Sequence, residues 1–161
     1  MKKSISRTAN ELRWFWRNYV FQSLFATFAI FIVLLYLGLQ EAVIIASLGA
    51  TAFVVFAMPK SITAKTRNVV GGHVVGLISG ALCALIPHPT LLLSAIVYSF
   101  AVGLSIFIMV IIDTEHPPAS GTALGVAIRG FSLNVTIAVV TSVIILSLIH
   151  RLSRRHLRDL T

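Results

Sequence analysis

The chain has 161 residues, of which 57% are hydrophobic and 11% are charged. Soluble domains carry about 25% charged residues, so this composition excludes an ordinary water-soluble protein and predicts an integral membrane protein. The net charge of +8 does not indicate nucleic-acid binding, because the basic residues stand at the ends of apolar runs, where they orient membrane segments and contact anionic lipid. Membrane lipid is the expected partner, and nucleic acid is not.

Basic segments flank the apolar part of the chain. Residues 1–19 contain five Lys and Arg residues and several aromatic rings, a combination that suits the headgroup layer of a membrane. Residues 151–161 contain four arginines and are predicted to form a basic cytoplasmic tail. Residues 20–150 between them are predicted to form one transmembrane domain.

Six apolar runs follow one another between these segments. Four are long enough to cross a bilayer as helices that rise about 1.5 Å per residue, at residues 20–39, 69–86, 91–112 and 133–149. Two are shorter and carry small polar residues, at 42–58 and 117–128. The predicted fold is therefore an all-α, polytopic membrane helix bundle with four long spans and two short or broken helices.

The basic residues favour one number of crossings. If both short runs cross, six passages place both termini and the 59–68 loop on one side, leaving only Arg129 of the thirteen Lys and Arg residues on the other. Four passages would move Lys60, Lys65 and Arg67 outside. The positive-inside tendency favours six passages with both termini cytoplasmic, as a multi-pass protein of a bacterial inner membrane. Four passages plus two re-entrant segments is the alternative.

Six passages divide into two halves of three, and an odd number of crossings inverts the second half. The short runs resemble each other, because Glu41 precedes the sequence ASLGAT at 46–51 and Glu115 precedes ASGT at 119–122. Paired short segments in corresponding places indicate a transport site between inverted repeats. We therefore expect a 3+3 inverted repeat whose short helices meet near the centre, with a chance match of small residues as the competing explanation.

The most polar stretch inside the apolar region is DTEHPPASGT at 113–122. Charged residues at membrane depth are a functional hypothesis by default, and the alternative is a polar connection at the membrane surface. The residue before a proline avoids helical angles and proline suits a first helical turn, so a helix is expected to begin at Pro117 or Pro118. The free amides of its first turn, at residues 119–121, favour a bound anion.

The start of the 69–86 run is expected to place Arg67, Asn68 and the Gly71–Gly72 backbone on the same inner side, where they would help to hold the anion. Asp113 and Glu115 would repel an anion, so they are expected to pair with Arg67 or Lys65, or one of them to carry a proton. His73 or His116 suits a proton-coupled cycle because imidazole titrates near neutral pH. For His73 the alternative is a hydrogen-bonded interior group.

Three glycines of the same run are spaced four residues apart, at Gly72, Gly76 and Gly80. They share one helix face and allow a second backbone to approach closely. Close helix packing is the favoured explanation.

The predicted substrate-binding residues are small and polar side chains of these regions: Ser47, Thr51, Arg67, Asn68, Gly72, His73, Glu115, His116, Ser120 and Thr122. No catalytic residue, metal or cofactor is expected, so the chain is not expected to be an enzyme. A metal site built from Asp113, Glu115, His116 and His73 matches no strong signature. The sequence also has no nucleophile elbow, P-loop or dinucleotide motif.

Three blocks of sequence resemble a known family. They are ASLGATA at 46–52, the spaced pattern P-S-A-RN-GGH at 59–73, and HPPA at 116–119. In this order they resemble the HPP family of integral membrane proteins, over most of residues 20–150. The family is usually described with four transmembrane helices, which the charge pattern supplements with two short segments.

The resemblance implies a function as well as a fold. Plant plastid and cyanobacterial members are linked to nitrite transport, so the resemblance implies a transporter or channel for a small inorganic anion, with nitrite or nitrate first. Two alternatives stay open: a non-transporting membrane scaffold or oligomerising subunit, and, less favoured, an intramembrane metal-dependent enzyme. A homo-oligomer is also left open, because a chain this small can need neighbours to enclose a path.

Overall fold

The computed structural model describes residues 16–18, 20–32, 35 and 42–160. Every regular element among these residues is helical, which confirms the all-α prediction. Residues 16–18 and 20–32 belong to a first helical stretch, and the later elements are α2 (Ala42–Ala57), the short 3-10 helix η1 (Ile62–Ala64), α3 (Thr66–Ala84), α4 (Leu91–Ile111), α5 (Pro118–Arg129) and α6 (Leu133–Ser153). Most of the predicted arm at 1–19 lies outside the described residues.

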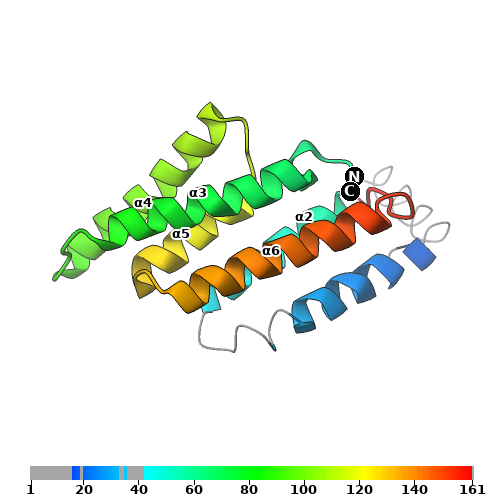
Figure 1. The fold of residues 1–161 in the computed structure, drawn as a ribbon, viewed down its shortest axis with the longest axis horizontal. Helices are drawn as coiled ribbons and strands as arrows, with labels where there is room; N and C mark the ends of the chain where they lie inside the picture. The colour runs from blue at the N-terminus through cyan, green and yellow to red at the C-terminus, as the bar shows by residue number, and fades with distance from the viewer. Residues whose placement is uncertain (1–15, 19, 33–34, 36–41, 161) are drawn as a thin grey trace, which may run out of the picture.

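Successive helices run in opposite directions along the long axis of the molecule (Figure 1). The centre is formed by α3 and α5: α5 packs against α2, α3 and α4, while α3 packs against α4, α5 and α6. The largest apolar core lies on the α2–α6 side and includes Leu48, Phe56, Val139 and Leu146. Helix α4 diverges from the bundle towards its C-terminal end (Figure 1).

The glycine stripe of α3 is the reason that α3 and α5 lie so close together. A Cβ atom at Gly76 would overlap the carbonyl oxygen of Ala119, and one at Gly80 would lie 2.5 Å from the carbonyl oxygen of Ala123. A Cβ at Gly72 would lie 2.7 Å from the Cβ of His116. The backbone of α5 therefore occupies the volume of the missing side chains at Gly76 and Gly80, and the Cβ of His116 occupies it at Gly72, which confirms the predicted close packing.

Two of the described helices, α4 and α6, are long and apolar enough to cross a membrane, at 21 residues each. Helix α3 has 19 residues, but Asn68, His73 and Ser79 lower its hydropathy and are buried inside the protein. The predicted run at 20–39 is only partly described. The four long spans and the number of crossings therefore stay predictions.

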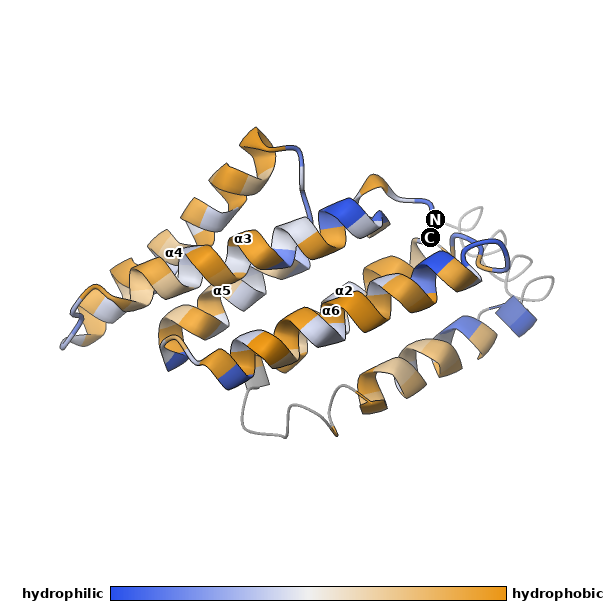
Figure 2. Cartoon of the chain, in the orientation of Figure 1, coloured by the Kyte–Doolittle hydropathy of each residue, from blue (hydrophilic) through white to orange (hydrophobic). Residues whose placement is uncertain are grey.

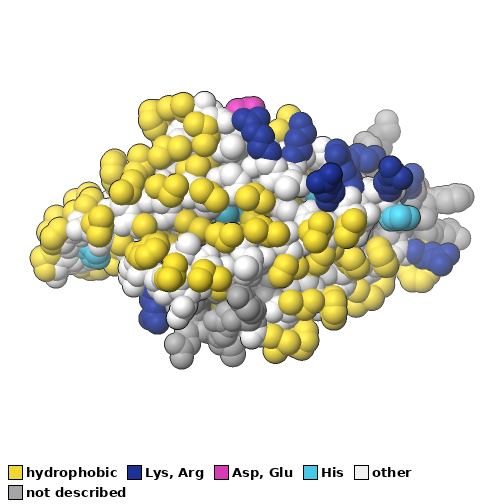
Figure 3. All heavy atoms as spheres, in the orientation of Figure 1, with side chains coloured by type: hydrophobic (Ala, Val, Ile, Leu, Met, Phe, Trp, Pro, Cys, Tyr) yellow, Lys and Arg dark blue, Asp and Glu magenta, His cyan; other side chains and the backbone are white. Residues whose placement is uncertain are grey.

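The outer surface separates charge from apolar area. Polar residues gather at helix ends and connections (Figure 2), and apolar side chains cover much of the rest of the face in Figure 3. Most Lys and Arg side chains visible on that face lie towards one end of the long axis (Figure 3). Arg129 ends α5, which runs towards the other end (Figure 1).

Residues after α6 pack against the start of the first helical stretch and the end of α2. Gln22 Nε2 donates to the carbonyl oxygen of Arg158 at 2.8 Å, and the amide of Leu160 donates to Ala57 O at 2.8 Å. The amide of Lys60 donates to Asp159 Oδ1 at 3.1 Å. The tail and the loop after α2 therefore lie at the same end of the molecule.

Candidate functional site

A line of hydrogen-bonding groups crosses the interior where α2, α3 and α5 meet. His116 Nδ1 donates to the carbonyl oxygen of Thr63 at 2.8 Å, and His116 Nε2 lies 3.0 Å from Thr51 Oγ1. Thr51 Oγ1 lies 2.8 Å from His73 Nε2. On the other side of the His73 ring, Nδ1 lies 2.8 Å from Thr122 Oγ1. The two imidazole rings are thus linked through a single hydroxyl, with their centroids 5.2 Å apart.

The line continues from α5 to α2 and ends at a second carbonyl. Thr122 Oγ1 lies 2.9 Å from Ser47 Oγ, and Ser47 Oγ donates to the carbonyl oxygen of Pro118 at 2.6 Å. We call the whole set the histidine–hydroxyl network: the side chains of Ser47, Thr51, His73, His116 and Thr122, with the carbonyl oxygens of Thr63 and Pro118 at its ends.

All five side chains of this network are buried, with at most 4% of each residue exposed. Burying a polar group without a partner costs free energy, so buried polar groups in native proteins are nearly always hydrogen-bonded. A bundle that needed only packing would place apolar side chains here. The network is therefore the strongest candidate for a functional site among the described residues.

Local sequence explains how each helix contributes. Ser47 and Thr51 are four residues apart, so they lie on the same face of α2, and Thr51 Oγ1 also lies 3.1 Å from Ser47 O. Helix α5 begins at Pro118, with Pro117 before it, as the sequence predicts. This start leaves His116 outside the helix, where its ring reaches both Thr63 and Thr51.

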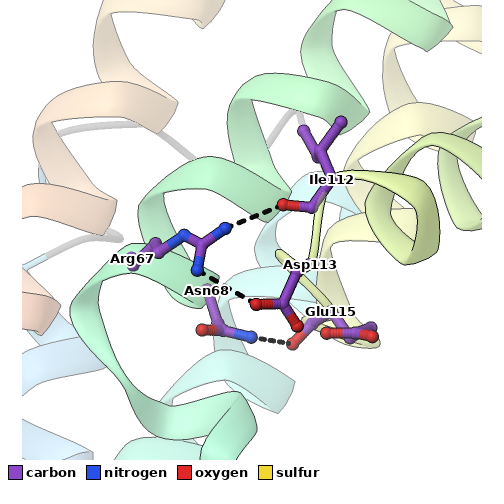
Figure 4. Close-up of polar contacts among 5 residues, drawn as sticks. All are labelled: Arg67, Asn68, Ile112, Asp113 and Glu115. Atoms are coloured by element: carbon purple, nitrogen blue, oxygen red, sulfur yellow. Dashed lines mark hydrogen bonds and ion pairs between the residues drawn. The ribbon is translucent and has the colours of Figure 1, made fainter.

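The α4–α5 connection is held by the first turn of α3 (Figure 4). Arg67 donates to Asp113 Oδ2 at 3.0 Å and to Ile112 O at 2.9 Å, and Asn68 Nδ2 donates to Glu115 O at 3.1 Å. The expected pairing of Asp113 with Arg67 is confirmed. Both side chains of the pair are exposed, at 64% and 74%, so Arg67 fastens the connection and does not reach the network.

Asp113 combines this ion pair with an unfavourable backbone conformation, since its φ is 57°. Residues with a Cβ atom lose about 1–2 kcal/mol in that region, while glycine does not. We expect the free energy of unfolding of Asp113→Ala to be lower than that of Asp113→Gly by about 1 kcal/mol. Both variants lose the ion pair, but only alanine has a Cβ atom that makes the left-handed conformation unfavourable. Thermal unfolding in detergent measures the difference, and equal stabilities would contradict the explanation.

The expected anion cradle at the start of α5 is not found in the form that the sequence indicates. The amide of Ala119 donates to His116 O at 2.8 Å, and the amide of Ser120 donates to Pro117 O at 3.2 Å. Two of the three amides predicted to be free are therefore already bonded within the first turn. Ser120 Oγ also donates to Pro117 O, at 2.7 Å.

A cavity of about 280 Å³ lies between α4 and the start of α5. Its lining is mostly apolar, with Glu115, His116 and Ser120 as its polar members. His116 is therefore a member of the network that also lines this cavity. Two further cavities lie between the first helical stretch and α2, and Gln22, Ser23 and Phe53 are among their lining residues.

The structure brings half of the predicted binding residues together and places the others around them. Ser47, Thr51, His73, His116 and Thr122 form the network. Gly72 contacts it from α3, Asn68 and Glu115 lie at the α4–α5 connection, Ser120 lines the cavity, and Arg67 is at the surface. Within the part of the chain that the structure describes, no three His, Cys, Asp or Glu residues lie close enough to hold a metal ion.

Sequence reasoning missed two members of the network, the carbonyl oxygens of Thr63 and Pro118. It also missed Thr114, whose buried hydroxyl has no hydrogen-bond partner among the described residues. A backbone carbonyl carries no residue-type signal, so no pattern in the sequence could have found the first two. Thr114 lies against Gly71, where its Cγ2 fills the space of a missing side chain.

Comparisons with known proteins give one family and two relatives. The family model described as HPP, transmembrane region, matches residues 8–157. A transmembrane protein of Dictyostelium discoideum is 34% identical over 88 residues, which are 55% of this chain and 31% of the relative. A second one from the same organism is 33% identical over 81 residues, or 50% and 26%. The chain thus spans less than a third of the length of either relative, and no solved structure gives a significant match.

Proposed function

Because the chain belongs to the HPP transmembrane-region family of membrane proteins, we propose that it transports a small inorganic anion, with nitrite or nitrate first. One observation carries the proposal: five polar side chains meet in the interior of a largely apolar bundle, where α2 crosses α5. Polar groups inside a membrane protein are costly and mark substrate or proton pathways by default. The anion itself is inferred from the resemblance of the sequence to family members linked to nitrite transport.

The proposed arrangement in the membrane has six crossings with both termini cytoplasmic, in a bacterial inner membrane. The alternating helix directions support it (Figure 1), as do the basic side chains near one end of the molecule (Figure 3). The 3+3 inverted repeat is part of the same proposal. It is supported by the contact between the two short elements, since Ser47 of α2 bonds both Pro118 and Thr122 of α5.

The proposed route for the anion includes the cavity bordered by His116. Its polar lining groups are few, and such sparse polar groups in an apolar cavity orient a small ligand. Ser120 offers a hydroxyl there, and His116 links the cavity to the network. A protonated Glu115 would remove the repulsion that its carboxylate would otherwise exert on the anion.

Uptake of nitrite and nitrate into liposomes tests the proposal. The full chain, His116→Gln and the matched control His88→Gln are each reconstituted at equal density. His88 lies in the turn before α4 and contacts Tyr98, away from the network. We expect the native chain to give more flux than empty liposomes, and His88→Gln to give the same flux as the native chain. In His116→Gln the flux should fall about tenfold or more, as when a hydrogen-bonded binding group worth roughly 1.4 kcal/mol is lost. Native flux equal to that of empty liposomes would remove the claim for both ions.

A non-transporting scaffold or oligomerising subunit is the second candidate. The tight glycine contact between α3 and α5 favours it, because small residues at helix interfaces serve the packing and association of membrane helices. The same liposomes distinguish the two: a scaffold shows no flux of either ion.

A further inference from the structure

The histidine–hydroxyl network has fewer hydrogens than it has contacts. Six contacts follow one another in a line, from Thr63 O through His116, Thr51, His73, Thr122 and Ser47 to Pro118 O. Both ends of the line are carbonyl oxygens, which accept hydrogen bonds and cannot donate them. Every hydrogen in the line must therefore come from the five side chains between the two ends.

Each of these side chains supplies one hydrogen when it is neutral. A hydroxyl carries one hydrogen, and a neutral imidazole carries one N–H and one bare nitrogen. Five hydrogens cannot fill six contacts, so one contact always joins two lone pairs, whichever tautomers the rings adopt. The additional contact of Thr51 Oγ1 with Ser47 O adds another acceptor and no hydrogen.

We infer that this network is a binding site for one proton, shared by His73 and His116. A protonated imidazole donates from both nitrogens, so one added proton gives six hydrogens for six contacts. With the proton on His73, the ring donates to Thr51 and Thr122, Thr51 donates to His116 Nε2, and His116 Nδ1 still donates to Thr63. Thr122 then donates to Ser47, and Ser47 donates to Pro118 O.

The proton can move between the rings without breaking the line. His73 Nε2 passes its proton to Thr51 Oγ1 while Thr51 passes its own proton to His116 Nε2. His116 then donates from both nitrogens, and Thr51 donates to the bare Nε2 of His73. Every contact is filled before and after the transfer, so the Thr51 hydroxyl, at 2.8 Å and 3.0 Å from the two rings, is the bridge.

Few charged groups surround the two rings. The sequences of α2 and α4 contain no Asp, Glu, Lys, Arg or His. Helix α5 carries Arg129 at its last position, and α6 carries His150 and Arg151 in its last turn. On the remaining packed segments, Arg67 and Asp113 bind each other at the surface, Lys65 is exposed before α3, and Glu115 borders the cavity with His116.

Of these charged groups, Glu115 shares the lining of this cavity with His116, whose two ring nitrogens face Thr63 and Thr51. Burying a charge is costly without a compensating partner, and complete hydrogen bonding of both ring nitrogens offsets part of that cost. In the proposed transporter an anion in the cavity would balance the remainder, a consequence that rests on the proposed function. The proton site itself does not depend on transport.

Removing one hydroxyl from the line tests the inference, because each shorter piece then has as many hydrogens as contacts. Thr122→Val leaves three hydrogens for the three contacts of His116, Thr51 and His73, and one for the contact of Ser47 with Pro118. Ser47→Ala leaves four hydrogens for four contacts. Neither variant needs an added proton. Ser105→Ala is the matched control, because this buried hydroxyl donates to Val102 O on α4, outside the network.

The measurement is imidazole ¹⁵N NMR of the full chain, labelled at histidine and held in lipid nanodiscs, across a pH titration. His73→Gln and His116→Gln assign the two resonances. We expect native protein and Ser105→Ala to take up one proton shared by both rings. In Thr122→Val and Ser47→Ala the midpoint should fall by about one pH unit or more, a tenfold loss of proton affinity from losing one charge-assisted hydrogen bond. Equal midpoints in all four proteins, or no protonation of either ring while the native chain stays folded, would overturn the inference.

Discussion

Gly76→Ala is expected to destabilise the folded chain by about 1–3 kcal/mol, the usual cost of adding a methyl group to a site with no room for it. The new Cβ would overlap the carbonyl oxygen of Ala119 and lie 3.4 Å from the amide nitrogen of Ala123. Both are backbone atoms within α5, so no side-chain rotation relieves the clash. The two helices would have to separate, and the separation would also move Ala119 away from the α3 surface.

Gly103→Ala is the matched control for this prediction. Gly103 lies within α4, and a Cβ there would meet nothing within 4 Å. Alanine is favoured over glycine inside a helix by about 1 kcal/mol, so this variant should be as stable as the native chain or slightly more stable. Unfolding in mixed micelles of increasing SDS measures both variants. If Gly76→Ala matched Gly103→Ala, the glycine stripe would not be what holds α3 against α5.

Thr51→Val is expected to lower the free energy of unfolding by roughly 2 kcal/mol, since buried groups that lose a hydrogen-bond partner cost about 1–3 kcal/mol. Valine has nearly the same shape as threonine, so packing is retained. The hydroxyl that it removes contacts the Nε2 atoms of both His73 and His116, which leaves two buried ring nitrogens without a partner. Thr122→Val removes the partner of only one ring nitrogen and should cost less.

Thr136→Val makes the same chemical change outside the network. Thr136 Oγ1 donates to the carbonyl oxygen of Ser132, the residue just before α6, at 2.8 Å. Its loss should change stability by less than about 0.5 kcal/mol, as for substitutions away from special features. The double variant of Thr51 and Thr122 should cost less than the sum of the two single variants, because both interrupt one network. Thermal unfolding in detergent gives all the values, and strict additivity would show that the two hydroxyls act independently.

The parts of the fold that the sequence predicts correctly depend on local signals. The paired prolines place the start of α5 at Pro118, because proline is compatible with a first turn and not with a helix interior. The four-residue spacing of the α3 glycines predicts their shared face and close contact. Ser47 and Thr51 likewise share a face because of their spacing alone.

The parts that the sequence does not predict depend on distant backbone. Arg67 lies at the surface and donates to Ile112 O and Asp113 Oδ2, contacts that its sequence neighbours do not reveal, and its predicted role in holding an anion stays a prediction. The left-handed conformation of Asp113 brings the connection back towards α3. A glycine at this position would have predicted such a turn, but an aspartate does not. The amides of Ala119 and Ser120 are bonded because the turn before α5 is tighter than a free helix start.

The contact between α3 and α5 also restricts how this protein can move. Gly76 and Gly80 lie directly against the backbone of α5 at two successive turns. No layer of side chains separates the helices there, so we expect them to move as one rigid body. Helix α2 meets α5 through side chains instead, including Ser47 against Gly121 and Ile44 against Gly125, and rotamer changes allow such a surface to shear. An opening that hydrates the two imidazoles from the α2 side is therefore expected to move α2 while α3 and α5 stay together.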